Sequence, residues 1–125
     1  MAESPSMLAC EDSSAPGVWD VSLDYGGGKT GMQLWRISRD YCTLTIVSEP
    51  IDEYSPPSSH YGFVTEAGFR VSWINTVGAC DYCVDMSATT AENSFTGPID
   101  WRRRASGTGV CLPAEGRIVA AAVRR

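Results

Sequence analysis

The sequence of 125 residues contains one histidine and one lysine, and it has no run of 18 apolar residues. Without such a run, we expect no membrane-spanning helix. Any catalytic dyad or triad that needs an imidazole must use His60, and no G-x-S-x-G motif accompanies this residue. We therefore assign no catalytic residues and no cofactor. Enzymatic activity stays open, with the sequence leaning against it.

The pattern of an amphipathic helix is also missing, since no stretch combines a 3.6-residue apolar spacing with capping residues. Apolar residues instead recur at every second position. In 18–25, the residues Trp19, Val21, Leu23 and Tyr25 alternate with mostly polar neighbours, which is typical of a strand with one buried face. The same pattern predicts eight strands, at 18–25, 32–37, 41–48, 61–66, 69–77, 83–89, 95–103 and 117–123.

Eight short strands in succession predict an all-β fold, and in particular an eight-stranded antiparallel up-and-down β-barrel, because closure removes exposed strand edges. A two-sheet β-sandwich is the alternative. In a barrel of this kind, successive links alternate between the two ends. The links expected at one end are longer, at 26–31, 49–60, 78–82 and 104–116. The links expected at the other end are shorter, at 38–40, 67–68 and 90–94. The prediction is a cup with a rim of long loops and a floor of tight turns.

The length fits a single domain. Residues 1–16 are small, polar and proline-containing, so we expect a disordered leader or tether there and a barrel domain over 17–125. Within the leader, Met7-Leu8-Ala9-Cys10 resembles a bacterial lipobox, in which Cys10 would be lipidated. The basic and apolar regions of a signal peptide do not precede it.

A short motif at the start of the first strand carries a resemblance. Gly17-Val18-Trp19 matches the Gly-x-Trp opening of the lipocalins, so the chain resembles the lipocalin-like, or calycin-type, small barrels. In that family an arginine near the end of the last strand packs on the tryptophan, and the resemblance implies this role for Arg124 or Arg125. It also implies a small apolar or amphipathic ligand inside the cup.

Five cysteines in a chain of this length are typical of proteins outside the cytoplasm, so we expect a secreted or periplasmic protein or an outer-surface lipoprotein. In the cup, Cys80, Cys83 and Cys111 belong to the rim, whereas Cys10 and Cys42 belong to the floor. A disulfide needs Cα atoms within about 7 Å of each other. We therefore expect Cys83–Cys111 or Cys80–Cys111 at the rim, and Cys42 can reach only Cys10.

The C-x-x-C motif Cys80-Asp81-Tyr82-Cys83 allows two other interpretations. A redox site would need the motif at a helix N-terminus, and here it stands between strands. A structural zinc site, completed by Cys111 and His60, usually has two tight ligand pairs, and only one is present. We therefore expect no metal site.

The net charge of −5 argues against nucleic acid as a partner, although residues 101–125 carry six basic and one acidic residue. Membrane contact is expected only through the lipid anchor, and the sequence does not define an oligomeric state.

Barrel mouths commonly hold ligands. The candidate ligand-binding residues near the rim are Tyr25, Lys29, Tyr54, His60, Trp73, Tyr82, Trp101 and Arg104. The leading hypothesis is a secreted or lipid-anchored barrel that binds a small apolar or amphipathic molecule at its rim. The alternatives are an envelope structural or interaction protein without a ligand cavity, and a small barrel cyclase or isomerase.

Overall fold

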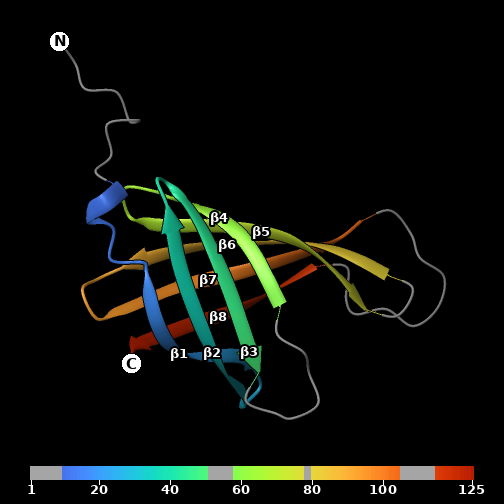
Figure 1. Ribbon diagram of the computed structural model, residues 1–125. Helices are drawn as coiled ribbons and strands as arrows, with labels where there is room; N and C mark the ends of the chain where they lie inside the picture. The colour runs from blue at the N-terminus through green and yellow to red at the C-terminus, as the bar shows by residue number, and fades with distance from the viewer. Residues whose placement is uncertain (1–9, 51–57, 78–79, 105–114) are drawn as a thin grey trace.

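The computed structural model describes residues 10–50, 58–77, 80–104 and 115–125. Eight antiparallel strands follow one another around a closed barrel, and β8 pairs with β1 to complete it (Figure 1). The strands are β1 Gly17–Gly26, β2 Lys29–Asp40, β3 Thr43–Pro50, β4 Ser58–Val64, β5 Gly68–Val77, β6 Cys80–Thr90, β7 Ser94–Arg103 and β8 Glu115–Arg124. The all-β up-and-down barrel is confirmed, and the sandwich is wrong. No helix in these parts of the chain has the length and apolarity to cross a membrane.

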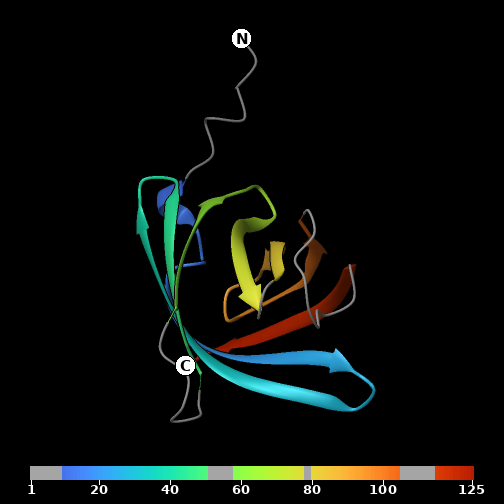
Figure 2. The ribbon, with the colours of Figure 1, turned by 90° about the vertical axis from the view of Figure 1, so that its right-hand side faces the viewer.

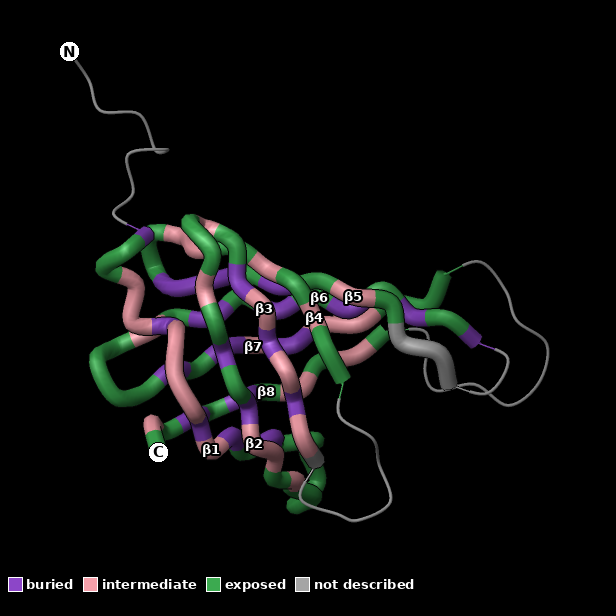
Figure 3. The backbone as a smooth tube through the Cα atoms, in the orientation of Figure 1, coloured by how far each residue is buried: buried purple, intermediate pink, exposed green. Residues whose placement is uncertain are grey.

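Alternating burial along the strands explains why this sequence forms a barrel. In β6, every second residue from Cys80 to Ala88 is buried, while the residues between them are exposed (Figure 3). Side chains of a strand point alternately to its two faces, so one face of each strand supplies the interior and the other meets solvent. The view along the barrel in Figure 2 shows the strands wrapping around a common interior.

The floor half of this interior is packed with large side chains. Trp19, Phe69, Phe95 and Leu44 are each at most 1% exposed. Phe95 lies at the centre, with its ring centroid 4.9 Å from Trp19 and 5.2 Å from Phe69, both edge to face. Such ring pairs contribute about 0.5–1.5 kcal/mol each beyond their area burial. The floor is therefore a solid aromatic layer.

Arg124 closes the floor from below. Its guanidinium carbon lies 4.2 Å from the ring centroid of Trp19, and its N–H groups donate to the carbonyl oxygens of Ser14, Pro16 and Glu92. This is the contact that the lipocalin-like resemblance implies, made by Arg124. Gly17 is required here, because a Cβ at this position would lie 2.4 Å from the guanidinium, and its φ of 141° disfavours other residues.

Residues 10–16 pack against the floor, which differs from the expected disordered leader. Cys10–Asp12 form a 3₁₀ turn, Ala15 is fully buried, and the Ala15 carbonyl accepts a hydrogen bond of 2.9 Å from the indole N–H of Trp19. A disulfide joins Cys10 to Cys42 in the β2–β3 turn, with the Cα atoms 5.2 Å apart. A sulfur in a disulfide cannot also form the thioether of a lipid anchor. The expected lipidation of Cys10 is therefore wrong for this disulfide-bonded state. Residues 1–9 lie outside the described part.

The two cysteines of the C-x-x-C motif differ in environment. Cys80 is fully buried and disulfide-bonded, whereas Cys83 is a free, exposed cysteine. Residues three apart in a strand point to opposite faces, and β6 already begins at Cys80. The expected Cys83–Cys111 pairing is therefore wrong. Position 111 lies outside the described residues. In the described parts of the chain, no cluster of metal-ligating side chains occurs.

Two of the predicted rim links, at 26–31 and 78–82, are shorter than expected. Only Gly27 and Gly28 separate β1 from β2, and only positions 78 and 79 separate β5 from β6.

One ladder of the barrel is short. β4 and β5 pair only between 62–64 and 69–71, whereas β5 and β6 pair along the full length of β5. Toward the rim, β4 and β5 diverge (Figure 2). The barrel is therefore weakest between these two strands on its open half.

Candidate functional site

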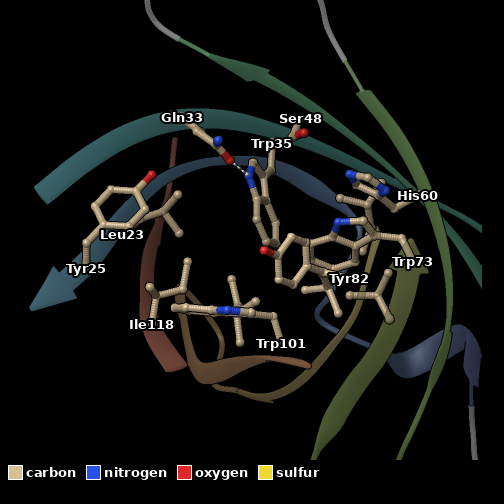
Figure 4. Close-up of a pocket in the computed structure, with 14 residues that line it drawn as sticks. Leu23, Tyr25, Gln33, Trp35, Ser48, His60, Trp73, Tyr82, Trp101 and Ile118 are labelled. Carbon is tan, nitrogen blue, oxygen red and sulfur yellow. Dashed lines mark hydrogen bonds between the residues drawn. The ribbon is translucent and has the colours of Figure 1, made fainter. Parts of the chain in front are cut away.

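The rim half of the interior contains a cavity of about 530 Å³. It lies above the floor layer, and Figure 4 shows side chains projecting into it from around the barrel. The cavity is lined by Leu23, Tyr25, Gln33, Trp35, Ile46, Ser48, His60, Val71, Trp73, Tyr82, Val84, Ile99, Trp101 and Ile118. None of these is an Asp, Glu, Lys or Arg side chain.

Rings from six of the strands make up much of the wall. They are Tyr25 of β1, Trp35 of β2, His60 of β4, Trp73 of β5, Tyr82 of β6 and Trp101 of β7. The Trp35 ring also lies 5.8 Å from the floor ring of Phe95, measured between centroids. The packed floor thereby supports the cavity wall from beneath.

Three polar side chains lie on the adjacent strands β2, β3 and β4. Ser48 pairs across the ladder with Trp35, and the inward neighbour of Trp35 on β2 is Gln33. His60 pairs with Ile46, which is the inward neighbour of Ser48 on β3. Diagonal neighbours on one face of a sheet are about 7–8 Å apart. Gln33, Ser48 and His60 therefore form a continuous row, called here the polar row.

The amide of Gln33 has a defined orientation. Its Oε1 accepts a hydrogen bond of 2.7 Å from the indole N–H of Trp35 (Figure 4). The Nε2 group on the other side of the amide donates to no atom of the described chain. The Ser48 side chain is buried, lines the cavity and has no protein partner within the described ranges. The polar row thus offers hydrogen-bonding groups to the cavity.

His60 bridges the barrel where the β4–β5 ladder has ended. Its ring stacks on Trp73 of β5, with the centroids 4.4 Å apart and the planes 29° apart. Burial lowers the pKa of His60 from its ordinary value of 6.5, because the half-buried ring is desolvated. In the described part of the cavity wall, no charged side chain offsets that cost, so the imidazole is neutral at neutral pH.

This environment predicts a loss of stability in mild acid. As the pH falls, His60 of the unfolded chain takes up a proton near pH 6.5, whereas His60 of the folded chain does so only at a lower pH, because its pKa is lowered. Protonation therefore favours the unfolded chain, and stability is lost as the pH falls through about 6.5 toward the lowered pKa of the folded state. Urea unfolding at about pH 7.5 and about pH 5.5 should show a larger drop for the natural chain than for His60→Gln. An equal drop in both proteins would contradict this role of His60.

The structure brings together five of the candidate rim residues predicted from the sequence, namely Tyr25, His60, Trp73, Tyr82 and Trp101. Lys29 and Arg104 are exposed and do not line the cavity. Tyr54 lies outside the described residues. Trp19, Phe69 and Phe95 lie in the packed floor, whereas Tyr25, Trp73 and Trp101 line the cavity.

Sequence reasoning missed Trp35 and the polar residues Gln33 and Ser48. Period two assigns Trp35 to the same face as Ile37, which is 5% exposed, so the alternation of the second strand was a usable signal. The same alternation places Ser48 on the face of Leu44 and Ile46, and the register of β2 and β3 then brings it beside Gln33 in the cavity wall.

Comparison with known proteins supports the fold. No protein-family model matches the chain, and no curated protein matches it. Among solved structures, EF1p2_mFAP2b bound to DFHBI is similar with a TM-score of 0.62 and 18% identity, over 98% of this chain and 100% of that one. A redesigned beta barrel, b11L5F_LGL, is similar with a TM-score of 0.55 and 16% identity, over 94% of this chain and 95% of that one. At this level of identity, the likeness is one of fold alone.

Proposed function

We propose that this protein binds a small, largely apolar molecule inside the open half of its barrel. The observation that carries the proposal is the division of the interior into two halves. Trp19, Phe69 and Phe95 fill the floor, whereas the rim half retains about 530 Å³ of space lined by rings and aliphatic side chains. Cavities of roughly 300–1,000 Å³ with this kind of lining are typical of small-molecule sites. A purely structural barrel would not need this space.

The similar barrel EF1p2_mFAP2b supports the proposal by analogy. That protein was solved with the small aromatic molecule DFHBI bound. This chain likewise forms a closed eight-stranded barrel. A barrel of this size is therefore able to accept a small aromatic ligand. At 18% identity, ligand specificity in this chain has to be argued from the residues that line its own cavity.

We also propose a location outside the cytoplasm, either secreted or periplasmic. The support is the disulfide Cys10–Cys42 and the disulfide-bonded state of Cys80. Disulfides persist in oxidising compartments and are rare in the cytosol. Since the sulfur of Cys10 is already bonded, this proposal does not include a lipid anchor at that residue.

Filling the cavity tests the binding proposal. Ile118 of β8 lines the cavity, and its neighbour Val119 is 48% exposed on the outer face. Ile118→Trp should place an indole in the cavity, whereas Val119→Trp adds the same side chain outside. Naphthalene, used as a neutral apolar probe, should bind to the natural chain and to Val119→Trp. Ile118→Trp should weaken its binding at least about tenfold, because the indole takes up space in which the probe would bury its apolar surface.

Thermal unfolding by circular dichroism establishes that each variant is folded before binding is measured. If the natural chain does not bind naphthalene at its solubility limit, or if folded Ile118→Trp binds as well as Val119→Trp does, the cavity is not a ligand site.

A further inference from the structure

We propose that the ligand is an uncharged, planar heteroaromatic molecule whose polar edge faces the row of Gln33, Ser48 and His60. This inference rests on the proposed function and adds the chemical class of the ligand. Three features of the cavity carry it: the absence of charged side chains among its described lining residues, the arrangement of rings, and the polar row on one side.

The first feature is electrostatic. No Asp, Glu, Lys or Arg of the described residues lines the cavity, and burial keeps His60 neutral at neutral pH. A charged ligand group would lose its hydration there without gaining a counter-charge, and burying an unpaired ion is strongly unfavourable. The cavity therefore selects against carboxylates, phosphates and ammonium groups.

The second feature is the arrangement of the rings. One face of Trp101 lies against Gly116 of β8, where an added Cβ would be 2.1 Å from the ring, so the absence of a side chain at Gly116 lets the indole lie flat in the wall. Trp73 is held by its stack on His60, and Trp35 by its hydrogen bond to Gln33. Rings fixed in this way offer faces and edges to a flat ligand, because offset and edge-to-face contacts between aromatic systems are favourable.

The third feature is that the amide, hydroxyl and imidazole of the polar row lie together on one side, whereas the hydroxyls of Tyr25 and Tyr82 come from β1 and β6. Gln33, Ser48 and His60 lie on the adjacent strands β2, β3 and β4. Elsewhere the wall includes the aliphatic side chains Leu23, Val71, Val84, Ile99 and Ile118. An amide N–H, a hydroxyl and an imidazole provide both donors and acceptors. The matching ligand edge is one that alternates carbonyl and N–H groups, as in a cyclic amide fused to an aromatic ring.

Two isosteric probes separate charge from shape. 2-Naphthamide joins a planar ring to a neutral group that donates and accepts hydrogen bonds, and 2-naphthoate replaces that group with a carboxylate of similar size. At neutral pH, we expect 2-naphthamide to bind at least about tenfold more tightly than 2-naphthoate, since only the latter buries an unpaired charge.

Two serine variants test the polar row. Ser48→Ala should weaken 2-naphthamide binding by about two- to tenfold, the usual effect of one neutral hydrogen bond, and should leave naphthalene binding within about twofold. Ser38→Ala, an exposed position of β2, is the matched control and should change neither. An equal loss for both probes in Ser48→Ala would show a packing effect and overturn the role of the row.

The outcomes distinguish this inference from the function on which it rests. If naphthalene binds but 2-naphthoate equals or exceeds 2-naphthamide, the neutral ligand class is wrong and the binding site stands. Dodecan-1-ol, a flexible neutral probe, should bind more weakly than 2-naphthamide, and the reverse order would overturn the planar class. If none of the probes binds, the proposed function fails together with the inference.

Discussion

Replacing Trp19 with alanine is expected to lower the free energy of unfolding by about 3–5 kcal/mol, which is the usual range for removing a buried aromatic side chain. Trp19 is fully buried and contacts three parts of the floor: the ring of Phe95, the guanidinium of Arg124 and the carbonyl of Ala15. The substitution would leave a cavity beneath the aromatic layer and remove the surface on which Arg124 lies. Urea unfolding measured by circular dichroism gives the change.

A second tryptophan provides the control. Trp73 is only partly buried and borders the open cavity, so Trp73→Ala should lose clearly less stability than Trp19→Ala, because it leaves no new closed void. The same variant should weaken binding of 2-naphthamide. Trp19→Ala losing no more stability than Trp73→Ala would contradict the division of the barrel into a packed floor and an open rim.

The second large effect concerns the disulfide between Cys10 and Cys42. The double variant Cys10→Ser/Cys42→Ser should lose about 3–4 kcal/mol in the chain-entropy model, since the bond joins residues separated by 32 positions. The bond also holds the segment that supplies the buried Ala15 and two carbonyl acceptors of Arg124. Urea unfolding measures the loss, and replacing both cysteines avoids leaving an unpaired thiol.

Cys83→Ser is the matched control, because Cys83 is free and exposed. Its stability should stay within about 0.5 kcal/mol of that of the natural chain, as is usual for surface positions. A double variant as stable as the control would show that the disulfide does not hold the floor. Alkylation of protein taken directly from its native compartment should modify Cys83 and spare Cys10 and Cys42. Rapid labelling of the latter two would contradict the proposed location outside the cytoplasm.

The fold could be predicted from the sequence because its main signal is local. Alternation with period two marks each strand by itself, and turn residues between the strands then order a meander. The contact between Trp19 and Arg124 was also predictable, but only through the resemblance carried by Gly17-Val18-Trp19. Cys10–Cys42 followed from the placement of links at the two ends of a barrel.

The site was harder to predict, because it depends on register and on volume rather than on local pattern. Gln33 and Ser48 form part of one wall only because of the register between β2 and β3, in which Trp35 lies opposite Ser48. Alternation places Ser48 on the inner face with Leu44 and Ile46, but it does not show that the interior is left unfilled at this height of the barrel. The error at Cys83 has a different origin, since the strand begins earlier than predicted, and a spacing of three within a strand places Cys80 and Cys83 on opposite faces.

The tryptophans themselves provide the most direct test of the central claim, which is that the open half of the barrel binds a small ligand above a closed floor. Of the four tryptophans in the chain, Trp35, Trp73 and Trp101 line the cavity, and Trp19 lies in the floor with its indole N–H bonded to Ala15. In a two-dimensional ¹H–¹⁵N spectrum, titration with 2-naphthamide should shift the indole signals of the three cavity tryptophans and leave that of Trp19 in place. Shifts confined to Trp19, or no shift in any indole signal at saturation of the probe, would contradict the account.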